Sequence, residues 1–145
     1  MFVDKAFGDD FINVTLRVGK TGAFDDVLFV QMMLKFIFDN SPFLRKASHF
    51  KGEVLVNGRA SPQLPVLIAA FQKHMMHRPK PQGFLNRATG TDAQKGRTTI
   101  WMLNGQCELT LAALRSPLKN VFELMAQMSP FAPKKIENTL PGIQP

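Results

Sequence analysis

The sequence has a single cysteine, Cys107, and no tyrosine among its 145 residues. One cysteine cannot form an intramolecular disulfide, and such a composition is typical of a reducing compartment. No apolar run reaches the ~20 residues that a membrane-spanning helix needs. The N-terminal residues MFVDKAFGDD carry acidic side chains and lack the basic and apolar regions of a signal peptide. We therefore expect the protein to be cytoplasmic as synthesised, and to reach the periplasm only by a route that reads no cleavable signal.

Carboxylates are also scarce, with 11 aspartates and glutamates against 18 lysines and arginines, and the formal net charge is +7. No pair of carboxylates stands out as a general acid and base. The positive charge gathers in residues 73–97, which could meet nucleic acid, an anionic wall polymer or an acidic protein, although an exposed loop is the simplest interpretation. Nucleic acid is the least favoured, because only Phe84 and Trp101 accompany the basic residues and no nucleic-acid motif is present.

The histidines and the cysteine predict neither a metal site nor a nucleophile. His74 and His77 are three residues apart, but a metal would need further ligands, and two basic residues near the negative end of a helix are the favoured explanation of the spacing. Cys107 has no histidine beside it in the sequence, so a small buried side chain is the expected role. We predict no metal, no cofactor and no catalytic residue.

Residues 11–18, FINVTLRV, alternate apolar and polar side chains as a half-buried strand does. A lone strand needs a partner. Residues 108–114, ELTLAAL, alternate in the same way and are the predicted partner, although the same segment could be helical.

Residues 25–38, DDVLFVQMMLKFIF, predict a helix that is apolar nearly all round. Two aspartates suit its start and Ser41-Pro42 suits its end. Such a helix is either central in the fold or shared with a partner. Phe29, Met32 and Phe36 lie on its second apolar stripe and are the candidate partner-binding residues, with an oligomer through this helix as one alternative and burial within the chain as another.

The stretch from residue 52 to residue 75, GEVLVNGRASPQLPVLIAAFQKHM, combines a β-prone run, a turn and a helix. Asn57-Gly58 supplies turn chemistry, and Ser61-Pro62 reads as an N-cap followed by the first helical residue. Residues 82–104 repeat this layout more weakly, with glycine, a short apolar run, a polar turn and a helix start.

This stretch resembles the peptidoglycan-binding domain. The resemblance rests on Val56-Asn57-Gly58, Pro62, Ile68 and Phe71-Gln72, with Val27, Val30-Gln31 and Leu34 matching the family's first helix. The segment from Thr98 to Asn104 is similar to the third element of longer members. The resemblance implies a mainly α fold: a small helical core with an N-terminal β segment and a C-terminal helix.

For function, the resemblance implies a non-catalytic binding module for peptidoglycan or a related cell-wall polymer. Stand-alone members are often bacterial and lie beside contractile secretion systems, and the catalytic motifs of the family's enzymes are absent. The candidate ligand-binding residues are Asn57, Arg59, Gln72, Arg97 and Thr98, although a structural role is favoured for two of them, Asn57 in the turn and Gln72 at the helix end. The alternative is a protein-interaction adaptor that keeps the fold and has lost the wall ligand.

The C-terminal part predicts one more helix, opened by Ser116-Pro117 and ended by Ser129-Pro130. We expect residues 1–129 to form a single domain. Residues 130–145 are rich in proline and are expected to be an extended tail with apolar side chains for docking.

Overall fold

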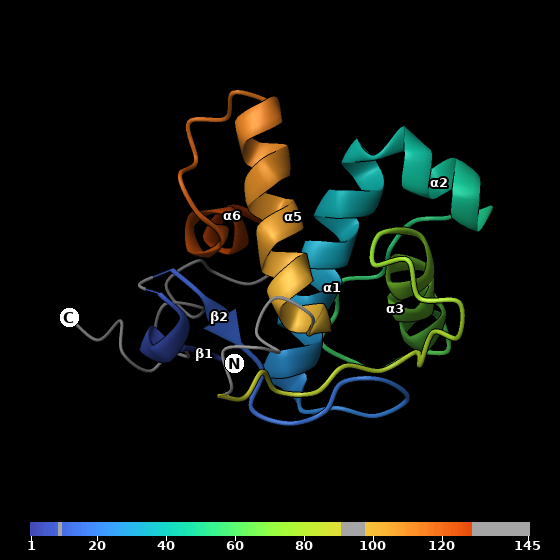
Figure 1. Cartoon of the computed structure of the whole chain (residues 1–145), viewed down its shortest axis with the longest axis horizontal. Coiled ribbons are helices and arrows are strands. Elements are labelled where there is room, and N and C mark those ends of the chain that lie inside the picture. Colours follow the sequence, from blue (N-terminus) through green and yellow to red (C-terminus); the bar gives the residue numbers. More distant parts are fainter. Residues whose placement is uncertain (9, 91–97, 129–145) are drawn as a thin grey trace.

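The computed structural model describes residues 1–8, 10–90 and 98–128. In these ranges the protein is mainly helical, with five α-helices and a short two-stranded sheet near the N-terminus, which confirms the predicted fold class (Figure 1). The elements follow the order β1 (Phe2–Val3), η1 (Lys5–Phe7), β2 (Ile12–Asn13), α1 (Phe24–Asn40), α2 (Pro42–Ser48), α3 (Gln63–His74), α5 (Thr99–Ala113) and α6 (Val121–Met128).

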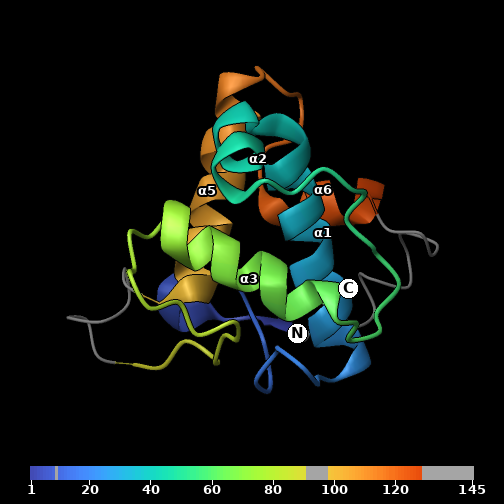
Figure 2. The ribbon, with the colours of Figure 1, turned by 90° about the vertical axis from the view of Figure 1, so that its right-hand side faces the viewer.

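Helix α1 lies at the centre and packs against α2, α3, α5 and α6. Figure 2 shows α3 crossing in front of α1 and α5. Phe29 and Met32 are 0% and 1% exposed, so the chain itself covers most of the second apolar stripe. A partner could not reach these two side chains, and only Phe36 of the three predicted partner-binding residues stays partly accessible.

The aspartates at the start of α1 do not cap the helix as the sequence predicted. Ala23 is the N-cap residue and offers no side-chain hydrogen bond. Asp26 is instead buried, and its carboxylate lies 2.6 Å from the α-amine of Met1. The same carboxylate accepts hydrogen bonds from the backbone N–H groups of Thr15 and Leu16. Asp26 therefore ties the N-terminal segment to the start of α1.

The predicted strand pairing is wrong. β2 covers only Ile12–Asn13 and pairs antiparallel with β1, with Phe2 opposite Asn13 and Val3 opposite Ile12. Further along, Val18 forms an isolated bridge to Leu85. Residues 108–113 belong to α5, because burial there follows the helical period: Leu103, Cys107 and Leu111 are buried, whereas Leu109 is 67% exposed.

Two of the predicted helix starts also differ. The Ser61 hydroxyl is buried and has no hydrogen-bond partner among the described residues, so it does not cap α3. The last helix begins at Val121 instead of following Ser116-Pro117, and Asn120 accepts the backbone N–H of Glu123 there. Ser41 does act as a cap, for α2, by accepting the N–H of Leu44. The predicted tail, residues 130–145, lies outside the described residues.

The buried apolar side chains form one core cluster that runs from Met1 to Met125. Among the described residues, none of the helices is by itself long and apolar enough to cross a membrane. Helices α1 and α2 meet that criterion only together, as a pair bent by 99°.

Candidate functional site

Two buried glutamines each join a helix to a turn that contains glycine. Gln31 of α1 accepts the backbone N–H groups of Asn57 and Gly58, at 2.9 and 2.8 Å. Its amide nitrogen donates to the carbonyl of Arg59, at 3.0 Å. Because the Gln31 side chain is buried, these backbone groups have a protein partner where water is excluded.

Gln72 of α3 repeats this arrangement at a second turn. Its carbonyl oxygen accepts the N–H groups of Gln82 and Gly83, at 2.9 and 3.0 Å. Its amide nitrogen donates to the Phe84 carbonyl and to the Thr99 hydroxyl. Gly58 and Gly83 occupy equivalent places, and both have φ of +76°. The weak echo between the two stretches of sequence is therefore a repeated local geometry.

The second turn forms the wall of a polar cavity of about 330 Å³. Helix α5 begins at this cavity, and the Thr98 hydroxyl accepts the N–H of Trp101 as its N-cap. The positive end of the α5 dipole and the guanidinium groups of the lining make the cavity favourable to an anion. The lining residues are Arg78, Gln82, Leu85, Asn86, Arg87, Thr98 and Thr99.

A second cavity, of about 420 Å³, lies beside the first and shares Gln82 with it. Arg17 and Lys20 add two further positive charges here. The Arg17 guanidinium lies 4.1 Å from the centre of the Phe84 ring and donates to Asn86 at 2.8 Å. We call the two cavities together the basic cleft, and none of the described residues that line it is a carboxylate.

Four of the five predicted ligand-binding residues are described, and they fall into two separate places. Thr98 lines the basic cleft, and the fully buried Gln72 positions the turn at Gln82 and Gly83, two residues that line the cleft. Asn57 and Arg59 lie beside the opposite end of α3, about 14 Å away by the helical rise. Arg97 lies outside the described residues. Sequence reasoning did not select Arg17, Lys20 or Asn86, because only the fold brings residues 17–20 beside residues 82–87.

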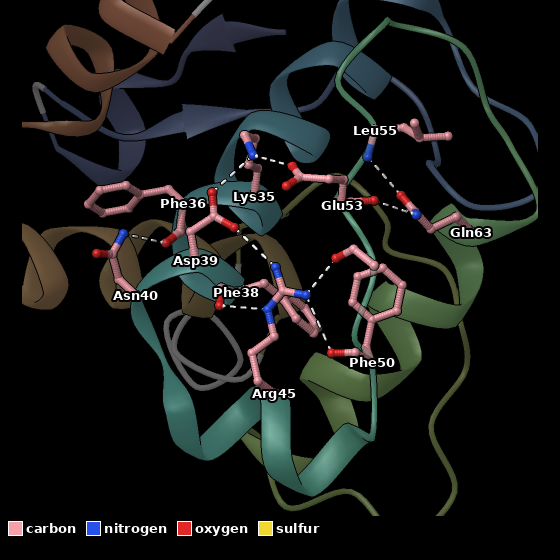
Figure 3. Close-up of polar contacts among 11 residues, drawn as sticks. Lys35, Phe36, Phe38, Asp39, Asn40, Arg45, Phe50, Glu53, Leu55 and Gln63 are labelled. Atoms are coloured by element: carbon pink, nitrogen blue, oxygen red, sulfur yellow. Dashed lines mark hydrogen bonds and ion pairs between the residues drawn. The ribbon is translucent and has the colours of Figure 1, made fainter.

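A second polar cluster joins α1, α2 and the segment that follows α2 (Figure 3). Arg45 donates to Asp39 and to the carbonyls of Phe38, Phe50 and Gly52. Lys35 contacts Asp39 and Glu53, and its hydrogen bond to Asp39 raises the pKa of the Lys35 ammonium. These hydrogen bonds and ion pairs join α1 to α2 and to the segment that follows, so the cluster stabilises the bend between the two helices.

Neither the histidines nor the cysteine build a reactive site in the described residues. Helix α3 ends at His74 and His77 follows with φ of +55°, so the two imidazoles do not share a helical face. No group of three or more potential metal ligands occurs among the residues that the structure describes. Burial raises the pKa of the Cys107 thiol, which keeps it protonated and unreactive.

Comparison of the chain with protein-family models, with curated proteins and with solved structures found no match.

Proposed function

We propose that the protein is a non-catalytic module that binds peptidoglycan or a related anionic cell-wall polymer through the basic cleft. The observation that carries this proposal is the charge of the cleft: four cationic side chains, Arg17, Lys20, Arg78 and Arg87, line it with no carboxylate among the described lining residues. Wall polymers present carboxylates along a hydroxyl-rich chain, and such groups suit guanidinium, amide and hydroxyl partners.

The basic cleft is built partly on a preformed turn. The two cavities share Gln82, and the Gln72 side chain accepts the backbone N–H groups of Gln82 and Gly83 in that turn. A preformed turn lowers the cost of ordering the site when a ligand binds. The resemblance to the peptidoglycan-binding domain supports the same class of ligand, and a role in a bacterial secretion apparatus belongs to this proposal.

Co-sedimentation with purified peptidoglycan sacculi tests the proposal at low and at high salt. Arg87→Gln removes a charge that lies at the cleft, where the guanidinium stacks 4.7 Å above the Phe2 ring. Arg59→Gln removes the same charge at the other end of α3 and is the matched control. We expect Arg87→Gln to weaken binding about tenfold and Arg59→Gln to leave it unchanged.

Each outcome has a defined meaning. Binding that persists at high salt and depends on Arg87 supports the module. Binding that disappears at high salt and falls equally in both variants indicates only non-specific electrostatic attraction between a basic protein and an acidic polymer. Absence of binding at both salt concentrations rejects the wall ligand.

A protein-interaction adaptor is the second candidate function, and an apolar cavity of about 460 Å³ favours it. Phe36 lines this cavity together with Leu111, Leu114 and Met128, and Leu114 is 54% exposed. Pull-down with the wild-type protein and with Leu114→Asp tests this candidate. A partner captured by the wild type and lost in Leu114→Asp supports the adaptor, whereas equal capture by both removes this surface from consideration.

A further inference from the structure

An aromatic pocket lies on another side of α5 from the basic cleft. Thr99 lines the cleft and Trp101 lines the pocket, and two residues turn a helix by about 200°. The pocket has a volume of about 300 Å³. Phe7, Phe11 and Trp101 form one cluster of rings in its wall, with ring centres 5.1 to 5.8 Å apart.

Two carboxylates share the pocket with these rings. Asp10 and Glu108 both line it, and neither forms an ion pair with a cation among the described residues. Asp10 accepts one hydrogen bond, from the side chain of Asn120 at 3.3 Å. Partial burial and the nearby charge of Asp10 raise the pKa of Glu108. Two like charges therefore face one cavity, and no described residue places a compensating positive charge beside them.

The remaining polar group of the pocket is already engaged. The Asn104 amide donates to the carbonyls of Ile12 and Ile100 and accepts the N–H of Ile12. Asn104 thus holds β2 against α5, and Asp10 and Glu108 are the described lining side chains that carry further hydrogen-bond acceptors.

We propose that this pocket binds a primary alkylammonium group, of the kind that ends a lysine side chain. The ammonium would donate hydrogen bonds to Asp10 and Glu108, and its charge would interact with the face of an aromatic ring. The alkyl chain would lie against Phe7, Phe11 and Trp101. This site is independent of the basic cleft and would take a ligand of the opposite charge.

Trp101 makes the test direct, because it is the only tryptophan and the chain has no tyrosine. The protein is titrated with n-butylammonium chloride at neutral pH and constant ionic strength, and Trp101 fluorescence is recorded. Sodium chloride and n-butanol serve as references for charge without an alkyl chain and for an alkyl chain without charge. We expect a saturable change with n-butylammonium alone.

Variants separate a cation site from a general apolar pocket. Glu108→Gln and Asp10→Asn should each weaken n-butylammonium binding about tenfold, since each removes a charged hydrogen-bond acceptor. Glu53→Gln removes an exposed carboxylate on the connection between α2 and α3 and should bind as the wild type does. Circular dichroism of each variant verifies that it is folded.

Two further ligands identify the chemistry and its source. Tetramethylammonium cannot donate a hydrogen bond, so it should bind more weakly than n-butylammonium. Nα-acetyl-lysinamide presents the same ammonium on a peptide-like group. Binding tighter than that of n-butylammonium assigns a peptide source, and weaker binding assigns a free amine.

Three results would each overturn the proposal. They are a response to n-butanol equal to that of n-butylammonium, tetramethylammonium binding as tight as that of n-butylammonium, and unchanged affinity in both carboxylate variants.

Discussion

The side chains of Gln31 and Gln72 form hydrogen bonds with backbone groups of irregular segments. In a β-sheet, such backbone groups would instead pair with those of a neighbouring strand. Each buried amide satisfies two backbone N–H groups and at least one carbonyl of an irregular segment. A buried backbone donor without a partner costs about 1–3 kcal/mol. Gln31 and Gln72 are therefore each expected to contribute more to the free energy of unfolding than a typical glutamine on a helix does.

Replacing Gln31 or Gln72 by Met keeps the side-chain length and removes the amide. We expect each variant to lose about 2–3 kcal/mol in the free energy of unfolding, because two backbone donors lose their acceptor. Chemical denaturation measures this loss. Gln127→Met on the exposed part of α6 is the control and should change stability by less than about 0.5 kcal/mol. Equal stability of all three variants would contradict the role assigned to the two amides.

Gly58 is required by its backbone conformation. Its φ of +76° lies in the region that other residues adopt only with strain, and an added Cβ would lie 2.3 Å from the Phe24 ring. We expect Gly58→Ala to destabilise the protein by about 1–3 kcal/mol, measured by thermal or chemical unfolding. Gly105→Ala is the matched control, because Gly105 lies within α5 and no described atom outside the backbone of its own helix would lie within 4 Å of an added Cβ. That variant should be stabilised by up to ~1 kcal/mol.

At the scale of elements, α5 divides two environments of opposite charge. Its first residues face the basic cleft, and Trp101 and Glu108 face the aromatic pocket. Its buried side chains, including Leu103 and Cys107, pack in the core. The helix therefore positions both candidate sites. The charge of Glu108, on the side of the helix that lines the aromatic pocket, is expected to affect the stability of the protein.

The raised pKa of Glu108 predicts how stability depends on pH. The ordinary pKa is 4.5, and a value raised in the folded state favours the protonated form there. Protonated Glu108 thus makes its full contribution to the free energy of unfolding below its unfolded pKa. This contribution is lost as the pH rises through the folded pKa and the side chain ionises. Glu108→Gln should be more stable than wild type at neutral pH, and the difference should shrink as the pH falls through the raised folded pKa and vanish below about 4.

Unfolding curves of the wild type and Glu108→Gln at several pH values measure this difference. Glu53→Gln controls for the loss of an exposed carboxylate. A Glu108→Gln variant that is less stable than wild type at neutral pH would show that the Glu108 charge is compensated.

The elements differ in how far the sequence predicts them. Helices α1 and α3 follow from apolar periodicity, and the turn at Asn57-Gly58 follows from residues that tolerate positive φ. The pairing of residues 11–18 could not be predicted, because β1 has two residues and carries no alternation of its own. Residues 108–114 fit both a strand and a helix, and only packing against α1 decides between them.

At the scale of the whole molecule, the basic cleft joins segments that are distant in the sequence. Residues 17–20 contact residues 83–86 through the Val18–Leu85 bridge and the Arg17 contacts with Phe84 and Asn86. Composition located the positive charge in residues 73–97, but Arg17 and Lys20 come from a segment outside that basic stretch. Asn57 and Arg59 precede the first residue of α3, whereas Gln72 lies near its last residue, so most of the length of α3 separates them.

NMR chemical-shift mapping with a soluble peptidoglycan fragment tests the central claim most directly, because it locates the ligand on the fold. We expect the shifts of backbone amides to concentrate in residues 82–87 and at Thr98 and Thr99, and Arg87→Gln to reduce them. Shifts at Asn57 and Arg59 instead, or no shifts under conditions where the protein binds sacculi, would contradict the assignment of the basic cleft.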